Sequence, residues 1–146
     1  MSYKIYIPID STALSLGADD VYKTIQDEAS QRKINLQIVR NGSRGLFWLE
    51  PMIEVETSQG RIAYGPVTID DVPSLFDAEF YLGKVHSLSH GLTEEITWLK
   101  NQERLTFARA GDWQKVSDFI KLNIIMPYIR FLFLNILVSK HRSTVK

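Results

Sequence analysis

The first forty residues alternate between two short apolar runs and one long amphipathic stretch. Residues 3–9 mix β-branched and aromatic side chains and end in a loop at Pro8-Ile9-Asp10, which predicts a short buried strand. From Gly17 to about Lys33, apolar residues recur at near-helical spacing behind two aspartates, which predicts an amphipathic helix. A second strand is predicted over Leu36–Val39, because the turn signal Asn41-Gly42 follows it.

The next forty residues carry the pattern of a hairpin and a short helix. Met52–Glu56 alternates apolar and acidic residues, Ser58-Gln59-Gly60 turns the chain, and Arg61–Tyr64 returns, so one face of the hairpin is expected to be buried. A helix is predicted through Phe76, with Thr68 or Asp70 as its N-cap. The predicted order of elements is β-α-β-β-β-α, which is an α/β fold.

Beyond residue 80 the sequence predicts a loop and then a helix. Residues 81–91 are rich in glycine, serine and histidine and are predicted to form a connecting loop. A further helix is predicted from Thr93, as N-cap, to about Arg104. The chain therefore divides into three predicted segments, 1–80, 81–111 and 112–146.

Composition narrows the function classes. The 146 residues suit one ordinary domain, and their 17 basic and 17 acidic side chains cancel, which argues against nucleic acid as a partner. Cysteine is absent, so disulfides, a thiol redox pair, a cysteine zinc site and conventional iron–sulfur ligation are all excluded. The N-terminus lacks a basic region followed by a long apolar run, which predicts a cytoplasmic protein.

Two segments resemble a known family. The runs NGSRGLFWLEPMIEV (41–55) and GRIAYGPVTIDDVPSLF (60–76) resemble the N-terminal thioredoxin-like domain of the beta subunit of NAD-dependent formate dehydrogenases. The run WLKNQERLTFARAG (98–111) resembles the segment that opens the flavin domain in these subunits and in related NADH-quinone oxidoreductase flavoproteins. The resemblance implies a thioredoxin-like βαβββα domain plus C-terminal helices, truncated before the flavin domain. FMN, NAD and iron–sulfur clusters are then expected only in the full-length family, and no cofactor is expected in this chain.

The same region resembles the thioredoxin-like [2Fe-2S] ferredoxins, in which two cluster cysteines lie in a Cys-Leu-Gly-x-Cys run. In that comparison Ser43 and Phe47 take the two cysteine positions, while Gly45 and Pro51 keep their places. Serine is a poor ligand and phenylalanine is none, so the resemblance implies a domain without a cluster.

The loop that carries these positions is also a candidate contact surface. Residues 41–45 offer glycines, backbone amides and Arg44, which could bind an anion or a partner's carboxylate, or could simply form a turn. Arg44, Leu46, Phe47 and Trp48 are the candidate subunit contact, because aromatic and arginine side chains dominate binding interfaces. For at least two of the apolar residues 46–49, packing in the core is the favoured interpretation.

Other polar groups have simpler interpretations. His86 and His90 are four residues apart but lie in a predicted loop without a third ligand. The acidic pairs Asp70-Asp71 and Glu94-Glu95 fall at helix starts, where acids are expected on electrostatic grounds. No histidine–aspartate partner can be identified for Ser11 or Ser43, so no hydrolase triad is predicted.

Residues 119–138 are long enough to span a bilayer, but they contain Lys121, Pro127 and Arg130, so a membrane span is less favoured than an amphipathic partner-binding helix or a poorly folded, aggregation-prone remnant. The sequence therefore predicts an accessory or docking domain of a formate dehydrogenase complex, which contacts its flavin domain or other subunits and holds no redox centre. The alternative is a stand-alone thioredoxin-like binding or scaffold protein, whose C-terminal helix associates with a partner or a membrane.

Overall fold

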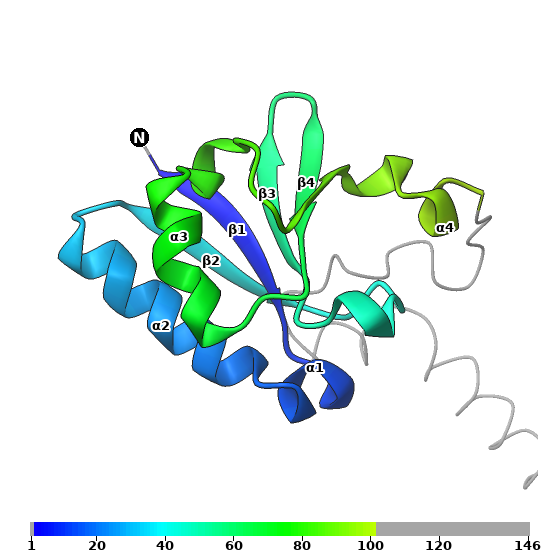
Figure 1. Cartoon of the computed structure of the whole chain (residues 1–146), viewed down its shortest axis with the longest axis horizontal. Coiled ribbons are helices and arrows are strands. Elements are labelled where there is room, and N and C mark those ends of the chain that lie inside the picture. The colour runs from blue at the N-terminus through cyan, green and yellow to red at the C-terminus, as the bar shows by residue number, and fades with distance from the viewer. Residues whose placement is uncertain (1, 102–146) are drawn as a thin grey trace, which may run out of the picture. The chain divides into compact units, whose positions relative to one another are not determined.

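A five-stranded mixed sheet forms the centre of the computed structural model, which describes residues 2–101 (Figure 1). The strand order is β2-β1-β3-β4-β5, with β1 and β2 parallel and the other neighbours antiparallel. The strands are β1 (Tyr3–Pro8), β2 (Leu36–Asn41), β3 (Ile53–Thr57), β4 (Gly60–Tyr64) and β5 (Ser89–Leu92). The helices are α1 (Ser11–Ser15), α2 (Ala18–Gln31), α3 (Val72–Asp77) and α4 (Thr97–Lys100). Single 3₁₀ turns are η1 (Phe47–Leu49), η2 (Ile69–Asp71), η3 (Phe80–Leu82) and η4 (Thr93–Glu95).

The β1-α2-β2 unit follows directly from the sequence pattern. Two adjacent parallel strands need a crossover, and α2 supplies it. Val21, Ile25 and Ala29 recur at four-residue spacing on α2 and are all buried. The predicted βαβββα order is confirmed, from β1 through α3.

The hairpin of β3 and β4 places opposite chemistry on the two faces of the sheet. Ile53 and Val55 belong to the core cluster beneath the helices, whereas the alternate residue Glu54 lies on the other face. Gly60 closes the turn at φ +126°, a backbone conformation that favours glycine. The hairpin therefore supplies both the core and the polar site described below.

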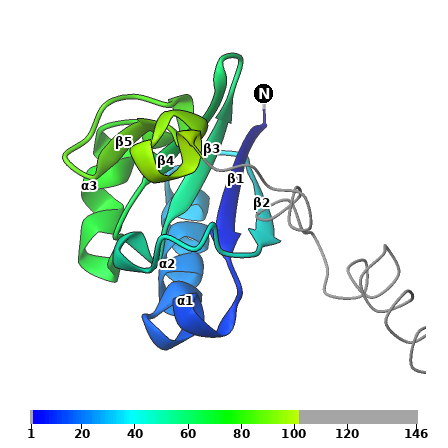
Figure 2. The ribbon, with the colours of Figure 1, turned by 90° about the vertical axis from the view of Figure 1, so that its right-hand side faces the viewer.

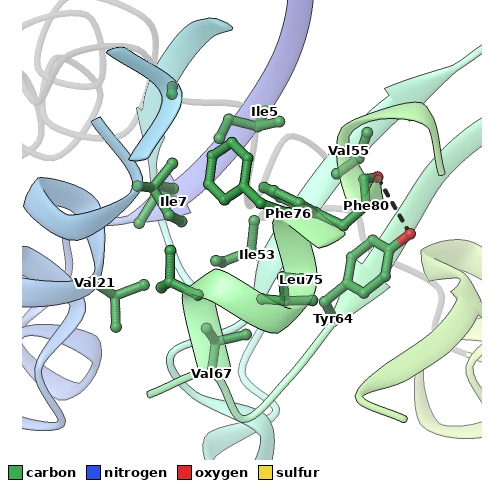
Figure 3. Packing of buried hydrophobic residues seen from close by; sticks show 13 residues of the cluster. Ile5, Ile7, Val21, Ile53, Val55, Tyr64, Val67, Leu75, Phe76 and Phe80 are labelled. Carbon is green, nitrogen blue, oxygen red and sulfur yellow. Dashed lines mark hydrogen bonds between the residues drawn. The ribbon is translucent and has the colours of Figure 1, made fainter. Parts of the chain in front are cut away.

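The main core lies between the sheet and helices α2 and α3 (Figure 3). The Phe76 and Phe80 rings meet edge to face with centroids 5.2 Å apart. The Tyr64 hydroxyl donates to the carbonyl oxygens of Lys84 at 2.6 Å and Phe80 at 3.3 Å, and burial raises the pKa of Tyr64 to about 12. The buried members of the core are Ile5, Ile7, Val21, Ile25, Ala29, Ile53, Val55, Tyr64, Val67, Val72, Leu75, Phe76 and Phe80.

Two elements differ from the sequence-based predictions. The loop predicted after β1 contains the short helix α1, which the Asp10 carboxylate caps by accepting from the amides of Thr12 and Ala13. The loop predicted over 81–91 was wrong at its end, because Ser89–Leu92 forms β5 on the edge of β4. A strand of four residues with glycine and histidine carries too little periodicity to be recognised alone.

Two further predictions were right in part. Of the two caps proposed for the helix through Phe76, Thr68 instead caps the preceding turn η2, where its amide and its hydroxyl both donate to the Asp71 carboxylate, and the N-cap of α3 itself is Asp71. The single helix predicted from Thr93 begins instead as the turn η4 and restarts at α4, because Ile96 is extended at ψ 127°. Its predicted continuation beyond residue 101 lies outside the described residues.

No helix within residues 2–101 is long and apolar enough to cross a membrane. The candidate segment 119–138 lies outside the described residues, so its association with a membrane or a partner stays a prediction. The division into segments 1–80, 81–111 and 112–146 also stays a prediction.

Gly65 tests how tightly the loop before β3 packs on the sheet. A Cβ at Gly65 would lie 2.4 Å from the Leu49 carbonyl oxygen, so Gly65→Ala is expected to cost about 1–3 kcal/mol of unfolding free energy. Gly42→Ala is the matched control, because a Cβ there meets nothing within 4 Å. Urea denaturation of both variants checks this, and equal midpoints would contradict it.

Candidate functional site

The candidate site lies at the end of the sheet where the parallel strands β1 and β2 finish. The segment 42–52 connects β2 to β3 there, and α1 lies at the same end (Figures 1 and 2). Loops at the carboxyl ends of parallel strands are common ligand sites in α/β proteins. Ser43 and Phe47, which the sequence comparison set against two cluster cysteines of the ferredoxins, belong to this segment.

A buried carboxylate organises the loop. The Ser43 hydroxyl donates to Glu50 Oε1 at 2.6 Å, and the Met52 amide donates to Glu50 Oε2 at 3.1 Å. The Gly45 amide in turn donates to Ser43 Oγ at 2.9 Å. Glu50 is only 4% exposed, so these bonds compensate a carboxylate that has lost most of its water.

The electrostatic surroundings of Glu50 are unfavourable to its charge. Burial raises the pKa of Glu50 above its ordinary value, the bonds from Ser43 and Met52 oppose that rise, and the charges of Asp10 and Glu54 add to it. Asp10 Oδ2 is itself buried and has no hydrogen-bond partner among the described residues. The carboxylates of Asp10 and Glu50 therefore repel each other.

These residues do not fit an iron–sulfur cluster. Such clusters are held by cysteine thiolates, which the sequence lacks altogether. The Ser43 hydroxyl is already committed to Glu50, and Phe47 offers no donor atom. Within residues 2–101 no three histidine or carboxylate side chains are grouped as metal ligands.

A second polar cluster lies beside the loop on the face of the sheet opposite the main core. Arg44 Nε and Nη2 donate to the two oxygens of Glu54 at 2.7 and 3.0 Å, and Arg61 Nη1 reaches Glu54 at 3.3 Å. Arg44 Nη1 also reaches Glu94 at 3.1 Å. Glu54 is 1% exposed, and Arg44 pairs within the chain with Glu54 and Glu94, so a contact of Arg44 with a partner's carboxylate stays a prediction.

The apolar residues of the loop divide into a buried pair and an exposed pair. Leu46 and Leu49 are buried, as predicted for at least two of the four. Phe47 and Trp48 are 59% and 57% exposed. Of the candidate subunit contact, the structure thus presents Phe47 and Trp48 to solvent, while Arg44 and Leu46 are buried.

Trp98 is a site residue that sequence reasoning missed. It lies on α4, fifty residues after Trp48, yet the two rings meet edge to face with centroids 5.9 Å apart. Trp98 is 65% exposed. No local pattern could have joined the two, because the contact depends on how α4 returns to the loop.

The remaining sequence candidates do not form a catalytic site. His86 Nδ1 accepts from the Leu88 amide, so Nε2 carries the proton and donates to Ser74 Oγ at 3.1 Å, the wrong direction for a base that activates a serine. His90 Nε2 donates to the Gly65 carbonyl oxygen at 2.8 Å. The acidic pairs at 70–71 and 94–95 lie in the turns η2 and η4. These turns precede the helices α3 and α4, so both pairs are near helix starts.

Comparison with known proteins identifies the fold. Neither a protein-family model nor a curated protein matches the sequence. The thioredoxin-like [2Fe-2S] ferredoxin from Aquifex aeolicus matches with a TM-score of 0.50 at 15% identity, over 61% of this chain and 96% of the ferredoxin. A variant of that ferredoxin with one cysteine replaced by serine matches with a TM-score of 0.50 at 16% identity, over 61% and 98%. At these identities the likeness shows the fold alone, and the chain has the predicted thioredoxin-like fold.

The Glu50 carboxyl provides a test by pH. Because its pKa is raised in the folded state, its contribution to stability is fully present below the unfolded pKa of about 4.5 and is lost as pH rises through the folded pKa. Glu50→Gln removes this titration, so wild type should lose stability relative to Glu50→Gln as pH rises from about 4.5 to about 7. Urea midpoints at several pH values measure it, with Asp27→Asn on the exposed side of α2 as control. Parallel pH profiles for wild type and Glu50→Gln would refute this account.

The Glu54 cluster provides a test by charge removal. Glu54→Gln leaves Arg44 and Arg61 without their buried counter-ion, so the free energy of unfolding is expected to fall by about 3–5 kcal/mol. Arg32→Gln is the control, since it breaks surface ion pairs with Glu28 and Asp77 that are worth about 0–1 kcal/mol. Equal losses in denaturant titrations of the two variants would show that burial of Glu54 has no energetic consequence.

Proposed function

We propose that this chain is an accessory docking domain of the flavoprotein (beta) subunit of an NAD-dependent formate dehydrogenase complex. The observation that carries the proposal is the loop after β2, which has no thiolate and presents Phe47 and Trp48 to solvent. The resemblance of residues 41–76 and 98–111 to these subunits supplies the family. The fold shared with a [2Fe-2S] ferredoxin is compatible with descent from an electron-transfer module.

In this proposal the chain supplies shape and apolar area, while electrons move elsewhere. FMN, NAD and the iron–sulfur clusters belong to other parts of the complex, which oxidises formate and reduces NAD in the cytoplasm. The two aromatic rings are the anchors, since large aromatic side chains contribute most of the binding energy at protein interfaces. Leu46 and Leu49, which flank them in the sequence, are buried in an apolar cluster, which keeps the backbone of η1 in place.

Co-purification tests the proposal. The tagged full-length chain is produced together with the subunits of an NAD-dependent formate dehydrogenase and purified by its tag. We expect flavin and formate-dependent NAD reduction in the eluate. For the double variant Phe47→Ala, Trp48→Ala we expect the affinity for these subunits to fall at least about tenfold, because an aromatic hot spot contributes about 1.4 kcal/mol or more to binding. Val85→Ala is the control, because Val85 is an exposed apolar residue far along the sequence from the loop.

The outcomes distinguish the docking domain of a formate dehydrogenase from the stand-alone binding or scaffold protein. An eluate without flavin and without formate-dependent NAD reduction would end the formate dehydrogenase assignment. If a flavin-free protein co-purified instead and depended on Phe47 and Trp48, the stand-alone binding or scaffold function would replace it.

A further inference from the structure

The segment 93–100, made of the turn η4 and the helix α4, is packed separately from the main core. Figure 1 shows α4 on the other side of the β3–β4 hairpin from α2 and α3. The amides of Ile96, Leu99 and Lys100 donate to carbonyl oxygens of the same segment, so these hydrogen bonds do not attach it to the sheet. Leu99 is 5% exposed, whereas Ile96 is half-buried and Trp98 is 65% exposed. One buried leucine therefore supplies most of the apolar contact of this segment.

The polar groups of the segment add little to its attachment. Glu94 pairs with Arg44, but the Glu94 side chain is 73% exposed, and an ion pair in contact with water contributes little to stability. Thr93 is fully buried, yet its hydroxyl has no hydrogen-bond partner among residues 2–101, so its burial is not compensated. Segments with few buried apolar contacts open at a lower free energy than the whole domain unfolds.

The surface beneath the segment is held by other contacts. Leu99 packs in one apolar cluster with Leu46, Leu49, Met52 and Ala63. Ala63 belongs to β4, the Met52 amide is bonded to Glu50, and Arg44 joins the loop after β2 to Glu54. None of these three attachments involves residues 93–100, so the apolar surface keeps its shape when the segment leaves it.

We propose that residues 93–100 form a lid, which opens and closes over the apolar surface of Leu46, Leu49, Met52 and Ala63 while the sheet stays folded. The closed lid holds Trp98 against Trp48, with ring centroids 5.9 Å apart. The open lid separates the two rings and exposes the apolar side chains of the cluster. Its regulatory meaning rests on the proposed docking function, because the loop then presents a larger apolar area to a partner. The opening itself does not depend on that function.

Thiol labelling of the full-length chain tests the lid, since the chain has no cysteine of its own. Ala63→Cys places a thiol beneath the lid, and Val55→Cys is the matched control on the neighbouring strand, in the main core. Both positions are 0% exposed. A disulfide reagent that releases a coloured thiol gives the two rates at low urea concentrations. We expect Ala63→Cys to react about tenfold or more faster than Val55→Cys.

The urea dependence separates lid opening from global unfolding. The rate for Ala63→Cys should hardly change at low urea, because opening a lid exposes little surface, whereas the rate for Val55→Cys should rise with urea. Equal rates for the two thiols, or the same urea dependence, would overturn the inference.

Two further substitutions act on one process each. Leu99→Ala removes the buried anchor of the lid, so the labelling of Ala63→Cys should become about tenfold or more faster. Ile25→Val weakens the main core, so it should speed the labelling of Val55→Cys about threefold and leave that of Ala63→Cys unchanged. An unaltered rate with Leu99→Ala, or equal acceleration of both thiols by Ile25→Val, would also contradict the lid. The labelling uses this chain alone, so its failure leaves the co-purification result standing, and a failed co-purification does not change the labelling.

Discussion

The buried Glu54 carboxylate is the constraint on which the functional end of this protein depends. It lies on β3, accepts from Arg44 of the loop after β2, and is reached by Arg61 of the neighbouring strand β4. Because Glu54 is almost fully buried, its charge is tolerated only while both cations stay in place. If the loop moved away from the sheet, Glu54 would lose its contact with Arg44 and remain a buried charge with one fewer counter-ion. Through Glu94 the same arginine also reaches the turn before α4, so one cluster positions both segments that carry the exposed tryptophans.

A second carboxylate controls the loop from its other end. Glu50 accepts from Ser43 and from the Met52 amide, so it closes the segment on itself just before β3. Gly65 contacts the same region so closely that no side chain fits between it and the Leu49 carbonyl. Ionic, polar and steric contacts thus act on one short stretch of chain. A loop fixed in this way loses little conformational entropy on binding, which is the property that a docking surface needs.

The sequence predicted the parts of the fold that depend on local patterns. Residues 18–31 and the hairpin at 53–64 have clear helical and alternating periodicities, and both formed as expected. The short elements α1 and β5 were missed, because five and four residues are too few to show a period. The sequence also identified Phe47 and Trp48 as contact candidates, but it could not place Arg44 against Glu54 or Trp98 against Trp48, since both contacts depend on long-range packing.

The proposed docking surface lies on a loop that the thioredoxin-like scaffold presents at the end of its parallel strands. Hydrogen-bonded carboxylates hold the loop after β2 in place in this chain. The same loop exposes two aromatic rings, those of Phe47 and Trp48. Rigidity together with exposed aromatic area is what a protein-binding site requires, so this loop has the physical properties that the proposed docking function needs.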